Sequence, residues 1–104
     1  MGKEEAIAFK LISLMGMARS HYLCAIDAAE SGTKEKYLDE MKKGDRCYKE
    51  GHRVHAELLT EIANGVKIEP HLLLIHAEDL LMSAETFSIM AKKFIALYNR
   101  LSYW

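Results

Sequence analysis

Residues 70–101 read PHLLLIHAEDLLMSAETFSIMAKKFIALYNRL, and the spacing of their apolar side chains predicts one long amphipathic helix. Pro70 suits the start of a helix, because the first helical turn leaves the backbone N–H groups without partners and proline has none. With 3.6 residues per turn, one face carries a packing residue at every third or fourth position. This face consists of Leu73, Ala77, Leu80, Ala84, Phe87, Ala91, Phe94 and Tyr98. We expect it to pack against the rest of the chain.

A second stripe lies beside that face on the same predicted helix. It consists of Leu72, His76, Asp79, Ser83, Met90 and Leu97, and it leaves only Glu78, Glu85, Lys92 and Asn99 for solvent. A helix that is apolar over so much of its circumference needs partners on two sides, and a three-helix chain supplies them on only one. We therefore expect the second stripe to contact another copy of the chain in a homo-oligomer.

Two breaks divide the sequence that precedes this helix. Ser31-Gly32-Thr33 combines a glycine suited to end one helix with a threonine suited to cap the next, and Asn64-Gly65 ends the second pattern. The predicted helices span about 4–31, 34–64 and 70–101. The short connections make successive helices antiparallel, so residues 1–104 should form one all-α domain, an antiparallel three-helix bundle.

Composition and charge exclude several classes of protein. Fourteen basic and fifteen acidic residues give a formal net charge of −1. The sequence therefore lacks the excess of positive charge that binding to nucleic acid or anionic lipid requires. Cys24 and Cys47 are not spaced as a metal knuckle or a redox pair, and we expect both to be reduced and buried. Lys10 and Arg19 interrupt the apolar start of the chain, which indicates neither a signal peptide nor a membrane span. The chain reads as cytoplasmic.

The second stripe carries the residues best suited to chemistry. His76 and Asp79 are three residues apart and so project from the same side of the predicted helix. Ionisable groups on an otherwise apolar stripe are costly unless they are paired or used. A neutral imidazole can attack a phosphoryl group through one ring nitrogen while the other keeps its proton. Spacing alone favours the simpler interpretation, a histidine satisfied by a hydrogen bond at a helix interface.

The other histidines form weaker patterns. His52 and His55 are three residues apart on the middle helix and could bind zinc together with a carboxylate. No HExxH arrangement accompanies them, and solvated surface positions are the simpler interpretation. His21, three residues before Cys24, fits packing at a solvated edge. His71 should be solvated in the first turn of the third helix.

Three stretches of the sequence, residues 16–20, 51–59 and 72–82, resemble the lactose/cellobiose-specific enzyme IIA family of the bacterial sugar phosphotransferase system. Residues 72–82, LLLIHAEDLLM, are similar to the family's LLLVHAQDHLM. Residues 16–20, GMARS, look like its G-x-A-R-S in the first helix. Residues 51–59, GHRVHAELL, fall where the family reads A-H-x-x-Q-T-x-L-I. The resemblance spans nearly the whole chain.

The resemblance implies a fold, an activity and a metal. Family members are three-helix proteins that assemble as trimers into a nine-helix bundle. The motif histidine, His76 here, would accept a phosphoryl group from the histidine-containing phosphocarrier protein and pass it to a cysteine of enzyme IIB. The motif aspartate, Asp79 here, would share one magnesium ion among three copies at the trimer axis. Such an ion would relieve the repulsion between three carboxylates.

The chain departs from the family motifs at a few positions. Leu80 stands where the family has a second histidine, Glu78 replaces a glutamine, and His55 and Ala56 replace Gln-Thr. We expect Glu78 to point to solvent, while His55 or His52 could take over the part of the missing histidine. These departures keep two alternatives open, a helical scaffold that has lost phosphotransfer and a histidine-based metal-binding bundle. The sequence names neither the sugar nor the cognate IIB.

Overall fold

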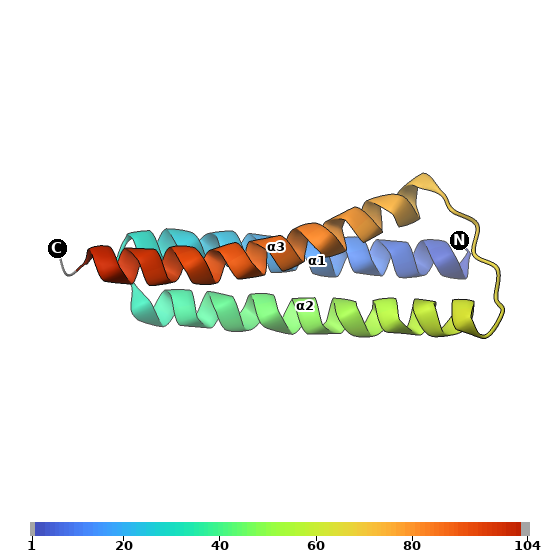
Figure 1. Cartoon of the computed structure of the whole chain (residues 1–104), viewed down its shortest axis with the longest axis horizontal. Coiled ribbons are helices and arrows are strands. Elements are labelled where there is room, and N and C mark those ends of the chain that lie inside the picture. The colour runs from blue at the N-terminus through green and yellow to red at the C-terminus, as the bar shows by residue number, and fades with distance from the viewer. Residues whose placement is uncertain (1, 103–104) are drawn as a thin grey trace.

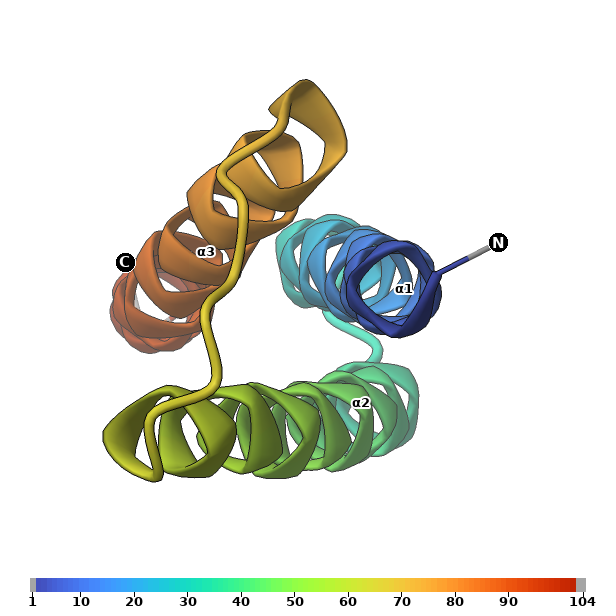
Figure 2. The same cartoon turned by 90° about the vertical axis from the view of Figure 1, so that its right-hand side faces the viewer.

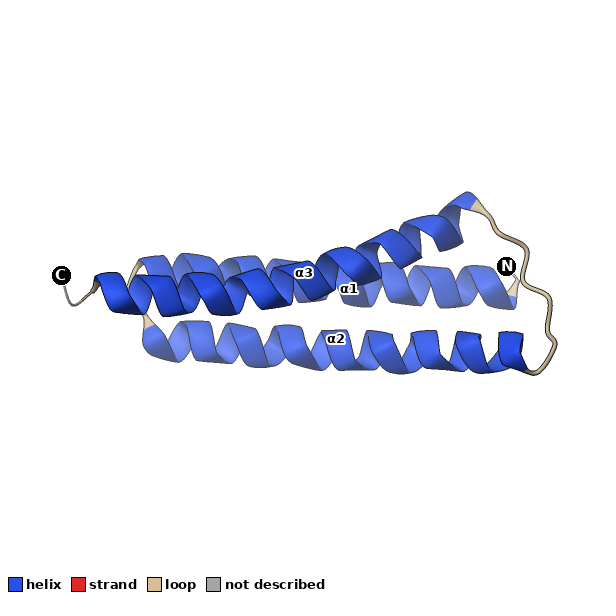
Figure 3. Cartoon of the chain, viewed as in Figure 1, coloured by secondary structure: helices blue, strands red, loops and turns tan. Residues whose placement is uncertain are grey.

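The computed structural model describes residues 2–102 and contains three long helices in antiparallel order (Figure 1). They are α1 (Lys3–Glu30), α2 (Lys34–Ala63) and α3 (Leu72–Leu101). Residues 2–102 contain no strand (Figure 3). The molecule measures 57 × 21 × 20 Å, so it is a narrow rod. The predicted all-α class and three-helix order are confirmed.

The first two helices end in the same kind of turn. After α1, Gly32 adopts a positive φ of 78°, and the backbone N–H groups of Gly32 and Thr33 donate to the carbonyls of Ala29 and Ala28. After α2, Gly65 (φ 90°) donates to Ile62, and the next residue donates to Glu61. This is the Schellman arrangement, in which glycine avoids the strain that a Cβ would meet at positive φ. The two glycine breaks read from the sequence are therefore the two turns of the bundle.

The third helix begins two residues later than predicted, at Leu72 instead of Pro70. His71 has an extended backbone and caps the helix, because its Nδ1 accepts a hydrogen bond from the Leu74 N–H at 3.2 Å. Its Nε2 is buried and has no hydrogen-bond partner among the residues that the structure describes. The prediction that His71 is a solvated residue inside the first turn is therefore wrong.

Helix α1 supplies most of the core. A heptad-like series of α1 residues with spacings of three and four is completely buried: Ala8, Leu11, Met15, Ala18, Tyr22 and Ala25. Both other helices pack extensively on α1, whereas α2 and α3 touch each other much less. Viewed end-on, the helices form a triangle that α3 leaves at its amino-terminal end (Figure 2).

The predicted packing face of α3 largely faces this core. Ala77, Ala84 and Ala91 are buried. Leu73, Leu80, Phe87 and Tyr98 are partly buried and pack against the core clusters. Phe94 is 36% exposed, so its predicted burial is wrong within one chain. Leu81 and Ser88, which the helical periodicity did not assign to this face, are buried.

Tyr22 is the largest fully buried side chain and carries a polar contact into the core. Its hydroxyl donates a hydrogen bond to Asp45 Oδ1 on α2 at 2.7 Å. Burial, reinforced by Asp45, raises the pKa of the Tyr22 hydroxyl far above its ordinary value, so the group stays protonated and remains a donor. The contact ties α1 to α2.

Two glycines inside α2 make room for large α1 side chains. A Cβ at Gly44 would lie 2.7 Å from Cε1 of Tyr22, and a Cβ at Gly51 would overlap the methyl end of Met15. Glycine lowers helix propensity by about 1 kcal/mol relative to alanine, so its presence within a helix calls for such a packing reason.

We expect Gly44→Ala to lower the free energy of unfolding by about 1–2 kcal/mol, because overpacking outweighs the gain in helix propensity. The Tyr22 ring cannot retreat without breaking its bond to Asp45. Gly51→Ala is the matched comparison and should cost less, since the flexible end of Met15 can rotate away. Urea denaturation of both variants at one protein concentration checks the order. Equal stability of Gly44→Ala and the wild type would contradict it.

No helix within residues 2–102 is both long enough and apolar enough to cross a lipid bilayer.

Candidate functional site

The candidate site lies on the part of α3 that diverges from the other helices (Figure 1). Four consecutive residues point in different directions because each helical residue turns about 100° from the last. His76 and Asp79 are exposed, Ala77 is fully buried, and Glu78 faces α2. The structure therefore places both predicted site residues on the outward face of one helical turn.

The side chains of His76 and Asp79 have no polar partner within the described range 2–102. Neither makes a hydrogen bond or an ion pair there. A shallow apolar hollow lined by Leu72 and Leu73 adjoins the His76 ring. Within residues 2–102 the ring is therefore exposed, and no residue of its own chain satisfies it by a hydrogen bond.

The second stripe of α3 is left open by its own chain. Leu72 is 81% exposed, and five further apolar residues, which lie along α3 on the stripe or beside it, are at least 44% exposed: Ile75, Met82, Ile89, Met90 and Leu97. Soluble proteins rarely leave such a continuous apolar surface uncovered. This exposure agrees with the expectation that another copy covers the stripe, which a single chain does not test.

Glu78 does not point to solvent, as the helical wheel predicted. Its Oε1 lies 2.7 Å from Nε2 of His55 on α2, where the imidazole N–H can donate to the carboxylate. The His55 side chain is only 15% exposed, so the prediction of a solvated His55 is also wrong. Farther along α3, Asn99 donates to the Tyr37 hydroxyl at 3.2 Å. The presumed solvent line of α3 is the side that faces α2.

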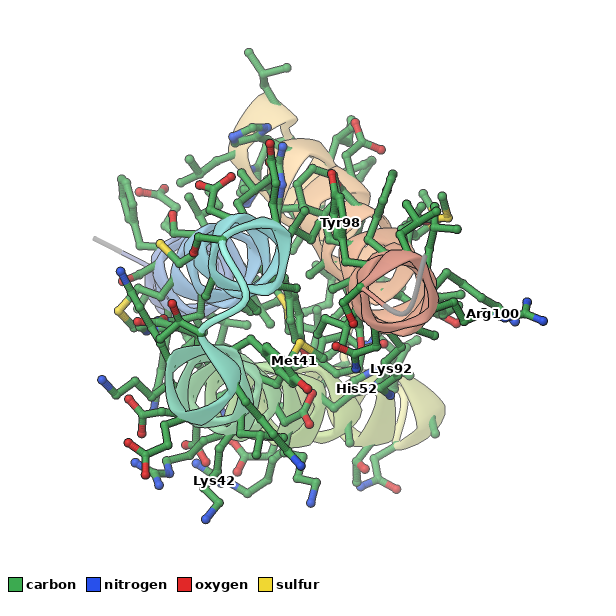
Figure 4. All side chains as sticks on the ribbon, turned by 90° about the vertical axis from the view of Figure 1, so that its left-hand side faces the viewer. Met41, Lys42, His52, Lys92, Tyr98 and Arg100 are labelled. Carbon is green, nitrogen blue, oxygen red and sulfur yellow. The ribbon has the colours of Figure 1, made fainter. Side chains whose placement is uncertain are left out.

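His52 has different contacts from His55. Its ring meets the Tyr48 ring edge-on, with centroids 4.6 Å apart. It lines a groove between α2 and α3 together with Ser88 and Lys92, and Figure 4 shows His52 and Lys92 side by side there. Within residues 2–102, no three His, Cys, Asp or Glu side chains come together in a way that could hold a metal ion. The two histidines therefore do not build a metal site within one chain.

We expected that His55 or His52 could take over the part of the histidine missing at position 80. Leu80 packs against the core between α1 and α3. His55 is bonded to Glu78, which projects from the side of α3 opposite His76, because two helical residues are about 200° apart. The expectation that His55 takes over this part is not supported by its position.

The remaining candidates are structural or exposed. His21 Nδ1 contacts Glu40 Oε2 at 2.7 Å and links α1 to α2. Both cysteines are free, but only Cys47 packs against the core. Cys24 is exposed, so its predicted burial is wrong, because it lies on the outward side of α1.

Arg19 makes a contact that the sequence did not predict. Its guanidinium carbon lies 4.6 Å from the centroid of the Phe87 ring on α3, in cation–π geometry. The signal was available, since Arg19 belongs to the GMARS motif and Phe87 to the packing face. The contact joins the two helices about three turns beyond His76.

With this geometry established, comparison with known proteins identifies the chain. Residues 6–99 match the family model described as the PTS system, Lactose/Cellobiose specific IIA subunit. The chain belongs to this family. As a sugar-specific IIA component of the phosphotransferase system, it is a phosphotransferase that acts in sugar uptake.

Two curated relatives and a solved structure agree with the assignment. The lichenan-specific phosphotransferase enzyme IIA component of Bacillus subtilis is 36% identical over 98 residues, covering 94% of this chain and 89% of the relative. The lactose-specific EIIA component of Streptococcus mutans is 32% identical over 102 residues, with 96% and 98% covered. The crystal structure of the cellobiose-specific enzyme IIA from Bacillus anthracis superposes with a TM-score of 0.96 at 38% identity, covering 99% of this chain and 94% of that one. The fold of this IIA component is therefore that of its relatives.

Proposed function

We propose that His76 carries the phosphoryl group of this IIA component. It accepts the group from the histidine-containing phosphocarrier protein and passes it to a cysteine of enzyme IIB. The observation that carries the proposal is the exposed His76 ring, which has no polar partner among the described residues. His76 lies on the open face of α3 and within the region that matches the family model.

The chemistry needs only the imidazole and its two protein partners. In the neutral ring one nitrogen offers a lone pair and the other keeps its proton. The lone pair forms an N–P bond as the P–N bond of the phosphorylated donor breaks. In the second step the thiolate of enzyme IIB attacks phosphorus, the N–P bond breaks, and neutral His76 is restored. The exposed position of His76 suits a residue that must meet two proteins in turn.

Incubation of the wild-type protein with the phosphorylated phosphocarrier protein tests the proposal. The mass should rise by one phosphoryl group per chain, and the modification should be acid-labile and base-stable and map to the peptide that contains His76. Binding of the phosphocarrier without any mass gain would support the scaffold alternative that Leu80 keeps open. Modification of another residue would refute the site.

We further propose that three copies of the chain pack together through the open face of α3. Six exposed apolar side chains on that face need a cover, and long helices side by side can bury them. Asp79 lies on the same exposed side, so assembly would bring one carboxylate from each copy towards the axis. Three adjacent carboxylates repel one another, and a hard cation with oxygen ligands, such as magnesium, would stabilise them.

Asp79 could hold such an ion only when several copies of the chain bring their carboxylates together. Asp79 is exposed and makes no ion pair within residues 2–102, and one chain contributes no complete ligand group. When bound, magnesium would supply positive charge between the three carboxylates.

Asp79→Ala should remove the bound metal, from one ion per three chains to none, because it removes every carboxylate of the proposed site. The trimer should persist, since the apolar face is intact. Elemental analysis and light scattering of the same sample measure both. Glu85→Ala, on the side of α3 away from Asp79, is the control and should keep the ion. A monodisperse monomer at micromolar concentration, or metal retained in Asp79→Ala, would contradict the assembly or the site.

A further inference from the structure

The helical turn that carries His76 is held by few contacts. The amino-terminal part of α3 leans away from α1 and α2 (Figures 1 and 2). Helices α2 and α3 touch each other far less than either touches α1. The direction in which His76 points therefore depends on the small number of side chains that fasten this turn to the bundle.

Apolar packing and one polar contact provide that attachment. Ala77 is fully buried in a cluster with Leu11 of α1 and Val54 of α2, and Leu73 and Leu74 pack against the same cluster. Glu78, directly after Ala77, adds the polar contact, with His55 of α2 at 2.7 Å. Because neighbouring helical residues differ by about 100° in direction, these two anchors together fix the rotation of the helix about its axis. They thereby fix the direction of the His76 side chain.

The Glu78–His55 contact is better shielded than an ordinary surface pair. The His55 side chain is 15% exposed and that of Glu78 is 42% exposed. The hydrogen bond between a carboxylate and a mostly buried imidazole is stronger and more directional than the interaction in a fully solvated ion pair. Hydrogen bonds of this kind are suited to holding a helix in one orientation.

We propose that His55 and Glu78 are positioning residues for phosphoryl transfer at His76, an inference that rests on the proposed function of His76. The structure brings these two side chains into contact between α2 and α3. The pair orients the reactive turn without touching the phosphoryl group.

The test compares initial rates of His76 phosphorylation by the phosphorylated phosphocarrier protein in a set of variants. His55→Ala and Glu78→Ala should each slow the reaction roughly three- to tenfold, because a misdirected nucleophile loses part of its orientation. The double variant H55A/E78A should be no slower than either single variant, since one interaction is lost in all three. The amide pair H55Q/E78Q should return the rate to within about twofold of the wild type.

A second His–Glu pair in the same chain provides the matched control. His21 and Glu40 are also 2.7 Å apart, but they join α1 to α2 away from His76. His21→Ala should leave the phosphorylation rate within about twofold of the wild type even if it lowers the melting temperature. Circular dichroism and light scattering on every variant show that fold and assembly are retained; Glu78→Ala and the amide pair are the variants expected to be least perturbed.

The outcomes separate this inference from the proposal on which it rests. An unphosphorylated wild-type protein would overturn the function of His76 itself. A phosphorylated wild type with unchanged rates in H55A and E78A would overturn only the positioning role. An equal loss of rate in H21A, or a failure of the amide pair to restore it, would show that the singles act through general stability.

Discussion

His76→Ala should abolish phosphorylation by the phosphocarrier protein, with a loss of rate of at least about three orders of magnitude, because the nucleophile itself is removed. The melting temperature should remain close to that of the wild type. His76 is exposed and makes no hydrogen bond within residues 2–102, and substitutions at such positions usually change stability by less than about 0.5 kcal/mol. Intact-protein mass spectrometry measures the modification, and a thermal melt measures the fold.

His52→Ala is the control for this result. His52 is also an exposed histidine on a helix, but it lines the groove between α2 and α3 and lies away from the open face of α3 (Figure 4). The His52→Ala variant should be phosphorylated as fast as the wild type. If His76→Ala were still phosphorylated and His52→Ala were not, the phosphorylation site would lie on α2.

Tyr22→Ala should lower the free energy of unfolding by about 3–5 kcal/mol, the largest effect on stability that we expect. The ring is completely buried between α1 and α2 and fills the space that Gly44 leaves open. Its removal leaves a cavity at the centre of a narrow rod that cannot collapse easily. Urea denaturation at a fixed protein concentration measures the change, since association also contributes to the stability of an oligomer.

Tyr22→Phe separates packing from the hydrogen bond. It keeps the ring and removes only the hydroxyl that donates to Asp45, so it should cost about 1–2 kcal/mol. If the phenylalanine variant were as unstable as the alanine variant, the hydrogen bond and not the filled volume would dominate. A loss below about 1 kcal/mol in Tyr22→Ala would contradict the packing role.

Local signals predicted the helices and turns well. Gly32 and Gly65 lie at the two positive-φ positions because helix endings obey local backbone geometry. The start of α3 was misplaced by two residues because the capping bond comes from the side chain of His71, a residue type that is not an ordinary helix cap.

The candidate site was only partly predictable. Periodicity placed His76 and Asp79 on one stripe, and the structure shows that side of α3 exposed. The same helical periodicity predicted that Glu78 points to solvent, whereas Glu78 binds His55. A wheel gives the angle between side chains of one helix, but it does not tell on which side the next helix lies. The close approach of Tyr22 to Gly44 likewise depends on how α1 and α2 lie together.

The sequence by itself determined that this protein consists of three long helices and that one of them has two apolar sides. It also carried the motifs by which the family can be recognised. Both follow from rules that act within about four residues, namely helical periodicity and backbone conformation at glycine. Only the tertiary structure decided that Glu78 binds His55 and that Tyr22 reaches Asp45, because those partners lie 23 residues apart in the chain and meet only through the packing of whole helices.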